Sequence, residues 1–238
     1  MPIVYKDVVQ GSAEWIDMRC GIPTASQFHR IITPGGKPSK SAEMYRFELI
    51  AERILGVATD PYISHWMDRG SEFEEDAVAF YELQVECDTT KVGFVTNDAG
   101  TIGASPDRLV GEDGLLEVKV GKPSTHVGYL LRSGVAYEEH KIQAQAQLWV
   151  TGRQWNDLMA YNPALPAVIH RVERDEDFIG LIAAAVTAFS RQLEEDYALC
   201  LQKGYIVQPK PAPEKTMVEI LKEELIKGKQ LTNNQMVF

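Results

Sequence analysis

The chain has 238 residues, of which 45% are hydrophobic, and its 34 acidic and 24 basic side chains give a net charge of −10 at pH 7. This composition is typical of a globular protein with ample length for a core, and it argues against a chain that coats DNA through an overall basic surface. It is neutral toward an enzyme that processes DNA, because a local basic channel can lie within an acidic exterior.

Signals of several other protein classes are missing from the sequence. The three cysteines are scattered, which argues against a disulfide framework and against a four-cysteine metal site. The five histidines lack the spacing of a zinc site, and no GxxxxGK[ST] or GxSxG segment is present. The first residues lack the apolar core of a signal peptide, and no apolar run approaches a membrane span, so we expect a cytosolic protein.

The first third of the chain is expected to be helical. Helical periodicity and capping residues predict helices over residues 12–21, 25–32, 41–56 and 67–85. Ser12 and Ser41 are the candidate N-caps, and Gly56 is a candidate C-cap. The segment 33–41, rich in glycine, proline and lysine, is expected to be a loop.

Strands dominate the middle of the chain and helices return after it. Apolar and alternating runs predict strands over residues 91–96, 101–110, 115–120, 156–161 and 167–172, and helices over residues 124–131, 137–150 and 175–201. This order predicts an α/β domain with a mixed central β-sheet flanked by helices. We expect one domain over residues 1–204 and a tail over 205–238, with a Pro-rich link and a short helix.

A predicted hairpin carries the strongest chemical signal. Gly111-Glu-Asp-Gly114 is typical of a turn, and the two strands that it joins would set Asp107 beside Glu117. Because side chains alternate along a strand, Glu117 and Lys119 are expected on one side and Val118 on the other. Two carboxylates and an ammonium at one point suit Mg²⁺ or Mn²⁺ and phosphodiester hydrolysis. An edge hairpin with solvated charges explains the same spacing, so the pattern alone leaves both interpretations open.

Two helices carry further candidates. Glu74 lies beside the apolar face of its helix and would be able to reach the hairpin, although the helix taken by itself favours a solvated acidic face. An otherwise apolar helix contains Gln143, Gln145 and Gln147, of which Gln143 and Gln147 share a face. Their amides would bind DNA or hold a water molecule, and ordinary surface glutamines are the alternative.

Residues near the N-terminus suggest an anion site. The cluster around two short helices consists of Arg19, Thr24, Ser26 and Arg30, and hydroxyls beside an arginine suit a terminal phosphate. Helix caps and a surface arginine explain the same residues without a ligand.

Taken together, these patterns resemble the lambda exonuclease family, whose members are viral recombination nucleases of the PD-(D/E)xK type. The resemblance covers residues 12–182, and the patterns occur in the same order as in the family. The matching segments are Trp15-x-x-x-Arg19-x-Gly21-x-x-Thr-Ala-Ser26, Gly70-x-x-x-Glu74-x-x-Ala77, Ser105-Pro-Asp-x-Leu109, Leu116-Glu-Val-Lys119 and Gln143-x-Gln-x-x-Leu-Trp-Val-Thr151. The turn at 111–114, the residues after Lys119 and the tail beyond Gly204 depart from the family pattern.

The resemblance implies a restriction-endonuclease-like core and a metal site. Two Mg²⁺ ions, for which Mn²⁺ would substitute, would be held by Asp107, Glu117, the Val118 carbonyl and Glu74. Lys119 would position or activate the attacking water, and Gln143 would be the active-site glutamine of the family. The resemblance also implies that Arg19 and Ser26, with Thr24 beside them, bind the DNA 5′-phosphate. The resemblance places Met67 near the apolar wedge with which the family separates the terminal base pair.

The activity implied is 5′-to-3′ digestion of one strand of linear duplex DNA to mononucleotides. The 3′ single strand that remains would serve recombination by strand annealing. The implied partners are double-stranded DNA with a free end, a single-strand annealing recombinase and two further copies of the chain in a homotrimeric ring. The basic candidates to line its channel are Lys37, Lys40, Arg46 and Arg132.

The implied location is the cytoplasm of a bacterial host, as a phage or prophage protein. A related endonuclease or a nuclease that prefers single strands is the alternative activity. A catalytically inert interaction module is the alternative from another class.

Overall fold

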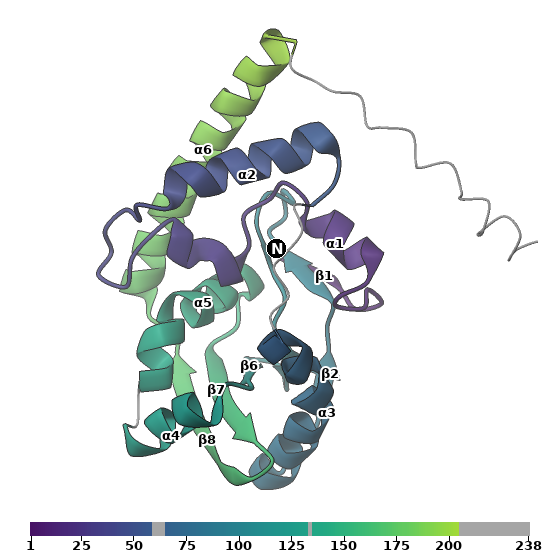
Figure 1. Ribbon diagram of the computed structural model, residues 1–238, viewed down its shortest axis with the longest axis vertical. Coiled ribbons are helices and arrows are strands. Elements are labelled where there is room, and N and C mark those ends of the chain that lie inside the picture. Colours follow the sequence, from purple (N-terminus) through teal and green to yellow (C-terminus); the bar gives the residue numbers. More distant parts are fainter. Residues whose placement is uncertain (59–64, 133–134, 205–238) are drawn as a thin grey trace, which may run out of the picture.

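The computed structural model describes residues 1–58, 65–132 and 135–204, and within these ranges it leaves the side chains of residues 65–72, 135–137 and 139 undescribed. The elements in chain order (Figure 1) are β1 Ile3–Tyr5, α1 Ala13–Arg19, η1 Ala25–Arg30, α2 Ala42–Leu55, α3 His65–Val85, β2 Thr89–Lys91, β3 Phe94–Thr96, β4 Gly103–Ala104, β5 Arg108–Val110, β6 Gly114–Lys119, α4 Pro123–Leu131, α5 Val135–Thr151, β7 Trp155–Asn162, β8 Leu165–Glu173 and α6 Glu176–Gln202. Among the described residues, no helix is long and apolar enough to span a bilayer.

A five-stranded mixed sheet forms the centre of the domain. Its strand order is β2-β5-β6-β7-β8, in which β6 and β7 run parallel and the other neighbours run antiparallel. The connection from β6 to β7 contains α4 and α5, as a parallel pair requires. The expected α/β fold with a mixed sheet flanked by helices is therefore confirmed.

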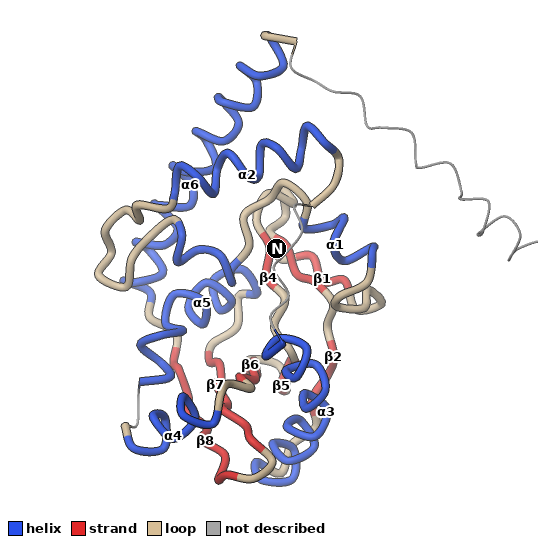
Figure 2. Tube along the Cα trace, viewed as in Figure 1, coloured by secondary structure: helices blue, strands red, loops and turns tan. Residues whose placement is uncertain are grey.

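Helices cover both faces of this sheet because both sets of alternating side chains are apolar. On one face Leu116 and Met159 pack against Ala77 and Tyr81 of α3. On the other face Leu115 belongs to the largest buried cluster, which also contains residues of η1, α2, α5 and α6. Figure 2 shows the red strands between α3 and α5. The middle of β6 therefore lies in the interior, whereas Lys119 at its end stays 25% exposed.

A second, three-stranded sheet with the order β1-β3-β4 corrects two strand predictions. The runs 91–96 and 101–110 were each expected to form one strand, but each divides between the two sheets. Gly93 marks the first break, where a Cβ atom would lie 2.0 Å from the Val8 carbonyl oxygen. Pro106 marks the second, because proline has no N–H to continue a ladder.

Gln10 stabilises both breaks at once. Its amide nitrogen donates to the Val92 carbonyl at 2.9 Å and to the Pro106 carbonyl at 3.0 Å. These carbonyls would otherwise lack the partners that an unbroken strand supplies. Asp107 follows the second break directly, so its side chain lies where the chain crosses from one sheet to the other.

Most helix predictions are confirmed, with local differences. The Ser12 side chain accepts from Trp15 N and Asp175 accepts from Phe178 N, as N-caps do. Residues 25–30 form a 3₁₀-helix, and Ser41 precedes α2 without a side-chain cap. The short helix expected in the tail lies outside the described residues.

The hairpin turn generates a stability prediction at Gly114. A Cβ atom there would lie 2.1 Å from Cζ2 of Trp155, and the Arg171 guanidinium also packs on this ring, 3.7 Å from its centre. We expect Gly114→Ala to destabilise the fold by about 1–3 kcal/mol through overpacking. The control is Gly180→Ala, because Gly180 lies in α6 with no atom near its Cβ position. That change is expected to stabilise by about 0.5–1 kcal/mol. Urea unfolding measures both, and equal stability of the two variants would contradict the prediction.

Candidate active site

Glu117 is a buried carboxylate at the middle of the central sheet. Its side chain is 5% exposed and lies on the face of β6 that α5 covers. Its Oε1 accepts from Lys119 Nζ at 2.7 Å and from Gln143 Nε2 at 2.6 Å, and its Oε2 accepts from Gln147 Nε2 at 2.7 Å. The alternative of a solvated edge hairpin is wrong, because β6 is the third of five strands.

Asp107 lies next to Glu117, as the predicted hairpin requires. The register pairs Arg108 with Leu116, so Asp107 and Glu117 occupy the adjacent positions. Asp107 Oδ2 accepts from the Val118 backbone N–H at 2.6 Å. Burial and then the Glu117 charge raise the pKa of Asp107 well above its usual value, although Lys119 and the Val118 N–H act in the opposite direction. Ionisation of Asp107 beside Glu117 is therefore unfavourable in the fold, first because the carboxyl is desolvated and then because two negative charges face one ammonium.

Lys119 supplies one positive charge to this pair. Its Nζ donates to Glu117 and, at 3.0 Å, to Gln143 Oε1. Burial disfavours the ammonium form, but Glu117 and Asp107 outweigh burial and raise the pKa of Lys119 above its usual value. In the protein without metal, Lys119 is thus a held ammonium ion that donates hydrogen bonds.

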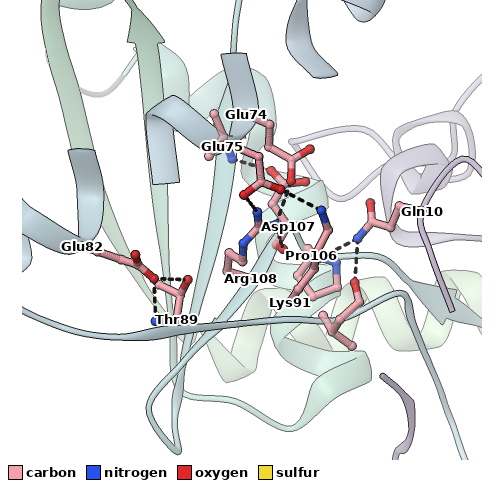
Figure 3. A network of polar contacts seen from close by, with 11 residues as sticks. Gln10, Glu74, Glu75, Glu82, Thr89, Lys91, Pro106, Asp107 and Arg108 are labelled. Carbon is pink, nitrogen blue, oxygen red and sulfur yellow. Dashed lines mark hydrogen bonds and ion pairs between the residues drawn. The ribbon is translucent and has the colours of Figure 1, made fainter. Parts of the chain in front are cut away.

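Glu74 reaches the site from α3 through a network around Arg108 (Figure 3). The buried Arg108 donates from Nη1 to Glu74 Oε1 and to the Asp107 carbonyl, both at 2.7 Å, and from Nη2 to Glu75 Oε2 at 2.9 Å. Glu75 also pairs with Lys91 at 2.8 Å. Glu74 therefore lies beside Asp107, as expected, with its carboxylate held by an arginine that the sequence analysis did not single out.

The donor set fits a hard divalent cation. The described residues contain no group of three or more histidine, cysteine or acidic side chains placed to hold a metal. What they offer is the carboxylates of Asp107 and Glu117 and the backbone carbonyl of Val118, which follows Glu117 in sequence. All three are oxygen ligands of the kind that Mg²⁺ prefers. The raised pKa of Asp107 is the electrostatic cost that a cation would relieve.

The remaining glutamines of α5 are buried, so the surface alternative is wrong for them. Gln145 is 0% exposed and Gln147 is 1% exposed. Gln145 donates to the Glu173 carbonyl and accepts from Asp175 N, whereas Gln147 faces the active-site carboxylate. Their spacing along the helix gave no means to separate these two roles.

Arg19 forms a second, cationic part of the site. Its guanidinium lies 4.0 Å from the centre of the Trp15 ring, and its Nη1 donates to Ser105 Oγ at 3.2 Å. Burial lowers the pKa of Arg19 to about 10, against the opposing effects of Tyr45 and Glu52. No carboxylate within the described ranges forms an ion pair with Arg19. A half-buried cation without an ion-pair partner suits an anionic ligand.

Tyr45 connects Thr24 and Ser26 to Arg19, because it contacts Thr24 and its charge acts on the pKa of Arg19. Thr24 N donates to Tyr45 Oη at 3.3 Å, and the hydroxyls of Thr24 and Ser26 are 3.5 Å apart. Tyr45 and Ser105 were missed as candidates from the sequence. Ser105 carried a signal, because it opens the Ser-Pro-Asp segment, whereas nothing in the pattern of α2 marked Tyr45.

The other candidates are placed less directly. The side chain of Met67 lies outside the described part of the structure. Lys37, Lys40 and Arg132 are exposed. Arg46 pairs with Asp196 at 2.7 Å, so its charge already has a partner within the fold.

Comparison with known proteins identifies similar chains. Residues 14–154 match the YqaJ-like viral recombinase domain. The alkaline exonuclease LHK-Exo from Laribacter hongkongensis is 34% identical, with a TM-score of 0.74 over 82% of this chain and 98% of that chain. Its complex with dAMP gives 33% identity and a TM-score of 0.75 over the same shares. A phage-related exonuclease from Haemophilus somnus shares the fold at 15% identity, with a TM-score of 0.61 over 74% of this chain and 95% of that chain. No curated protein matches.

The raised pKa of Asp107 generates a prediction for the protein without metal. A carboxyl with a folded pKa above its unfolded value of about 3.9 lowers stability once pH exceeds that value, because folding then opposes ionisation. We expect Asp107→Asn to raise the melting temperature at pH 8 in chelator by about 2–4 °C, which corresponds to about 1 kcal/mol for a domain of this size. The gain should vanish near pH 4.

Calorimetry with and without Mn²⁺ checks this prediction. Mn²⁺ should raise the melting temperature of the wild type and leave that of Asp107→Asn unchanged. A variant less stable than wild type at pH 8 in chelator would contradict the assigned charge imbalance.

Proposed function

The chain belongs to the YqaJ-like viral recombinase domain family, and we propose that it is a metal-dependent 5′-to-3′ exonuclease that digests one strand of linear duplex DNA. The relationship to the lambda exonuclease family expected from the sequence motifs is confirmed by this membership and by the likeness to LHK-Exo. The observation that carries the proposal is the hydrogen-bonded cluster of the buried Glu117 with the half-buried Asp107, Lys119 and Gln143.

Asp107, Glu117 and the Val118 carbonyl would hold Mg²⁺, with two ions in the complete site and Mn²⁺ as a substitute. When bound, such ions polarise the phosphodiester and lower the pKa of bound water. The excess negative charge of the two acids supports this assignment. Glu74 would complete the site by turning its carboxylate from Arg108 toward Asp107, where it would bind a metal ion or a water molecule on that ion.

Lys119 would position the attacking water and stabilise charge on the phosphoryl oxygens. Its raised pKa keeps the ammonium protonated before metal binds, which supports a role as donor. Gln143 accepts from Lys119 and donates to Glu117, so its amide holds the two side chains in register. We assign Gln143 to the active site on this basis.

Arg19, Thr24 and Ser26 would bind the 5′-phosphate of the strand being cut, with Ser105 as an added hydroxyl. Ser105 bonds Arg19 and precedes Asp107 by two residues, which joins the anion region to the metal region. A phosphate held there would present the first phosphodiester to the acids and set the direction of digestion. Met67 would act as the wedge that separates the terminal base pair.

The products and partners are proposed on the same grounds. LHK-Exo has been solved with dAMP, a mononucleotide, which supports release of mononucleotides. We propose a homotrimeric ring around the DNA and a single-strand annealing recombinase that receives the 3′ overhang. Residues 1–204 would form the nuclease domain and 205–238 a tail, in a phage or prophage protein of the bacterial cytoplasm.

Digestion of end-labelled linear duplex tests the activity. We expect Mg²⁺-dependent release of mononucleotides from 5′ ends and no cleavage of closed circular DNA. Lys119→Ala should reduce the rate by about 10²–10³-fold, the usual cost of removing one donor that stabilises developing charge, while Mn²⁺ binding persists. Cleavage of closed circles would favour the endonuclease, and digestion by Lys119→Ala at the wild-type rate would refute its assignment.

A comparison of 5′-phosphorylated and 5′-hydroxyl ends tests the anion region. Arg19→Ala should slow digestion of phosphorylated ends by about tenfold or more, since a hydrogen bond to a charged group contributes about 1.5–3 kcal/mol. Hydroxyl ends should be affected much less. The matched control is Arg30→Ala, because Arg30 also lies over an aromatic ring, at 4.6 Å from that of Tyr45, but is paired with Glu48. Equal losses on both ends in Arg19→Ala would rule out a phosphate site.

A further inference from the structure

Two buried side-chain amides form a hydrogen-bonded series behind Glu117. Gln147 of α5 donates from Nε2 to Glu117 Oε2 at 2.7 Å, and its Oε1 accepts from Asn156 Nδ2 of β7, also at 2.7 Å. Asn156 is 0% exposed. This hydrogen-bonded series thus runs from the active-site carboxylate into the interior, away from the cluster that Lys119 and Gln143 form.

The carboxylate dictates the orientation of both amides. An ionised carboxylate only accepts hydrogen bonds, so Gln147 must turn its NH₂ toward Glu117 and its oxygen toward Asn156. Asn156 must then present its own NH₂ to that oxygen. Reversing either amide alone would bring two oxygens together without a proton between them.

At the far end of this hydrogen-bonded series, the orientation of the amides leaves one buried oxygen without a partner. Asn156 Oδ1 is buried and has no hydrogen-bond partner among the described residues. A buried acceptor without a partner costs about 1–3 kcal/mol. By contrast, Gln145 on the same helix satisfies both ends of its amide with backbone groups. The Asn156 amide therefore contributes chiefly through what its NH₂ does for Gln147.

We propose that Gln147 is a positioning residue that fixes the plane of the Glu117 carboxylate for the divalent cation, and that Asn156 sets the orientation of Gln147. The inference rests on the proposed function, because it concerns the same metal site. Oε1 is held by Lys119 and Gln143 and Oε2 by Gln147, so the carboxylate cannot rotate without breaking a bond on the interior side. Partners of this kind contribute about 10–100-fold to metal affinity or activity.

Asn156→Asp is the sharpest test, because it has nearly the same shape and replaces the donor with an acceptor. Gln147 would then turn its NH₂ toward Asp at position 156 and its oxygen toward Glu117. We expect Mn²⁺ affinity, measured by titration calorimetry without DNA, to fall by about tenfold or more. Gln147→Met keeps the volume and removes the donor, and a similar loss is expected.

Gln145→Met is the matched control. It removes a buried amide from the same helix at a position that does not contact Glu117, so it should lower the melting temperature and leave Mn²⁺ affinity unchanged. If Asn156→Asp does not fold, Gln147→Met decides. Wild-type Mn²⁺ affinity in Gln147→Met, or an equal loss of affinity in Gln145→Met, would overturn the inference.

The wild type separates this inference from the proposed function. If the wild type binds Mn²⁺ and digests linear duplex while Gln147→Met and Asn156→Asp bind Mn²⁺ equally well, only the positioning role fails. If the wild type neither binds Mn²⁺ nor digests DNA, the proposed function fails, whatever the variants do.

Discussion

Burial of the Glu117 carboxylate in the middle of the sheet is the constraint on which the rest of the site depends. A carboxylate in the interior is unfavourable unless hydrogen bonds and positive charge compensate it. The chain supplies Lys119 from the same strand and Gln143 and Gln147 from α5. Because these donors come from two segments, α5 must pack on this face of the sheet for the strand to be stable, and the packing that folds the domain also assembles the site.

The division of two predicted strands between the sheets has a similar double role. Gln10 and Trp15 both contact the crossing, where Trp15 donates to the Gly93 carbonyl at 3.1 Å and to Ser105 Oγ at 2.9 Å. The N-terminal segment therefore ties down the point at which Asp107 leaves the regular ladder. Asp107 can then accept from Val118 N and face Glu117, which a residue within an unbroken strand would not do in this register.

The sequence predicted what depends on near neighbours and missed what depends on distant ones. The turn at 111–114 and strand alternation were enough to place Asp107, Glu117 and Lys119 together. That β6 is central and not an edge depends on its pairing with β7, which begins 36 residues after Lys119. The break at Gly93 depends on a carbonyl of Val8, and the roles of Arg108 and Asn156 depend on side chains from other elements. Periodicity carries no information on such contacts.

In the proposed function, the segment Ser105-Pro106-Asp107 sets the distance between the phosphate-binding region and the metal site. Two residues of extended chain span at most about 6.6–7.2 Å, a length comparable with one nucleotide of a DNA strand. A phosphate site at Arg19 and a metal site at Asp107 would thus be joined by covalent bonds and not by a deformable interface, and the backbone itself would set the step size. A nuclease of this design that released longer products would need a different connection at these residues.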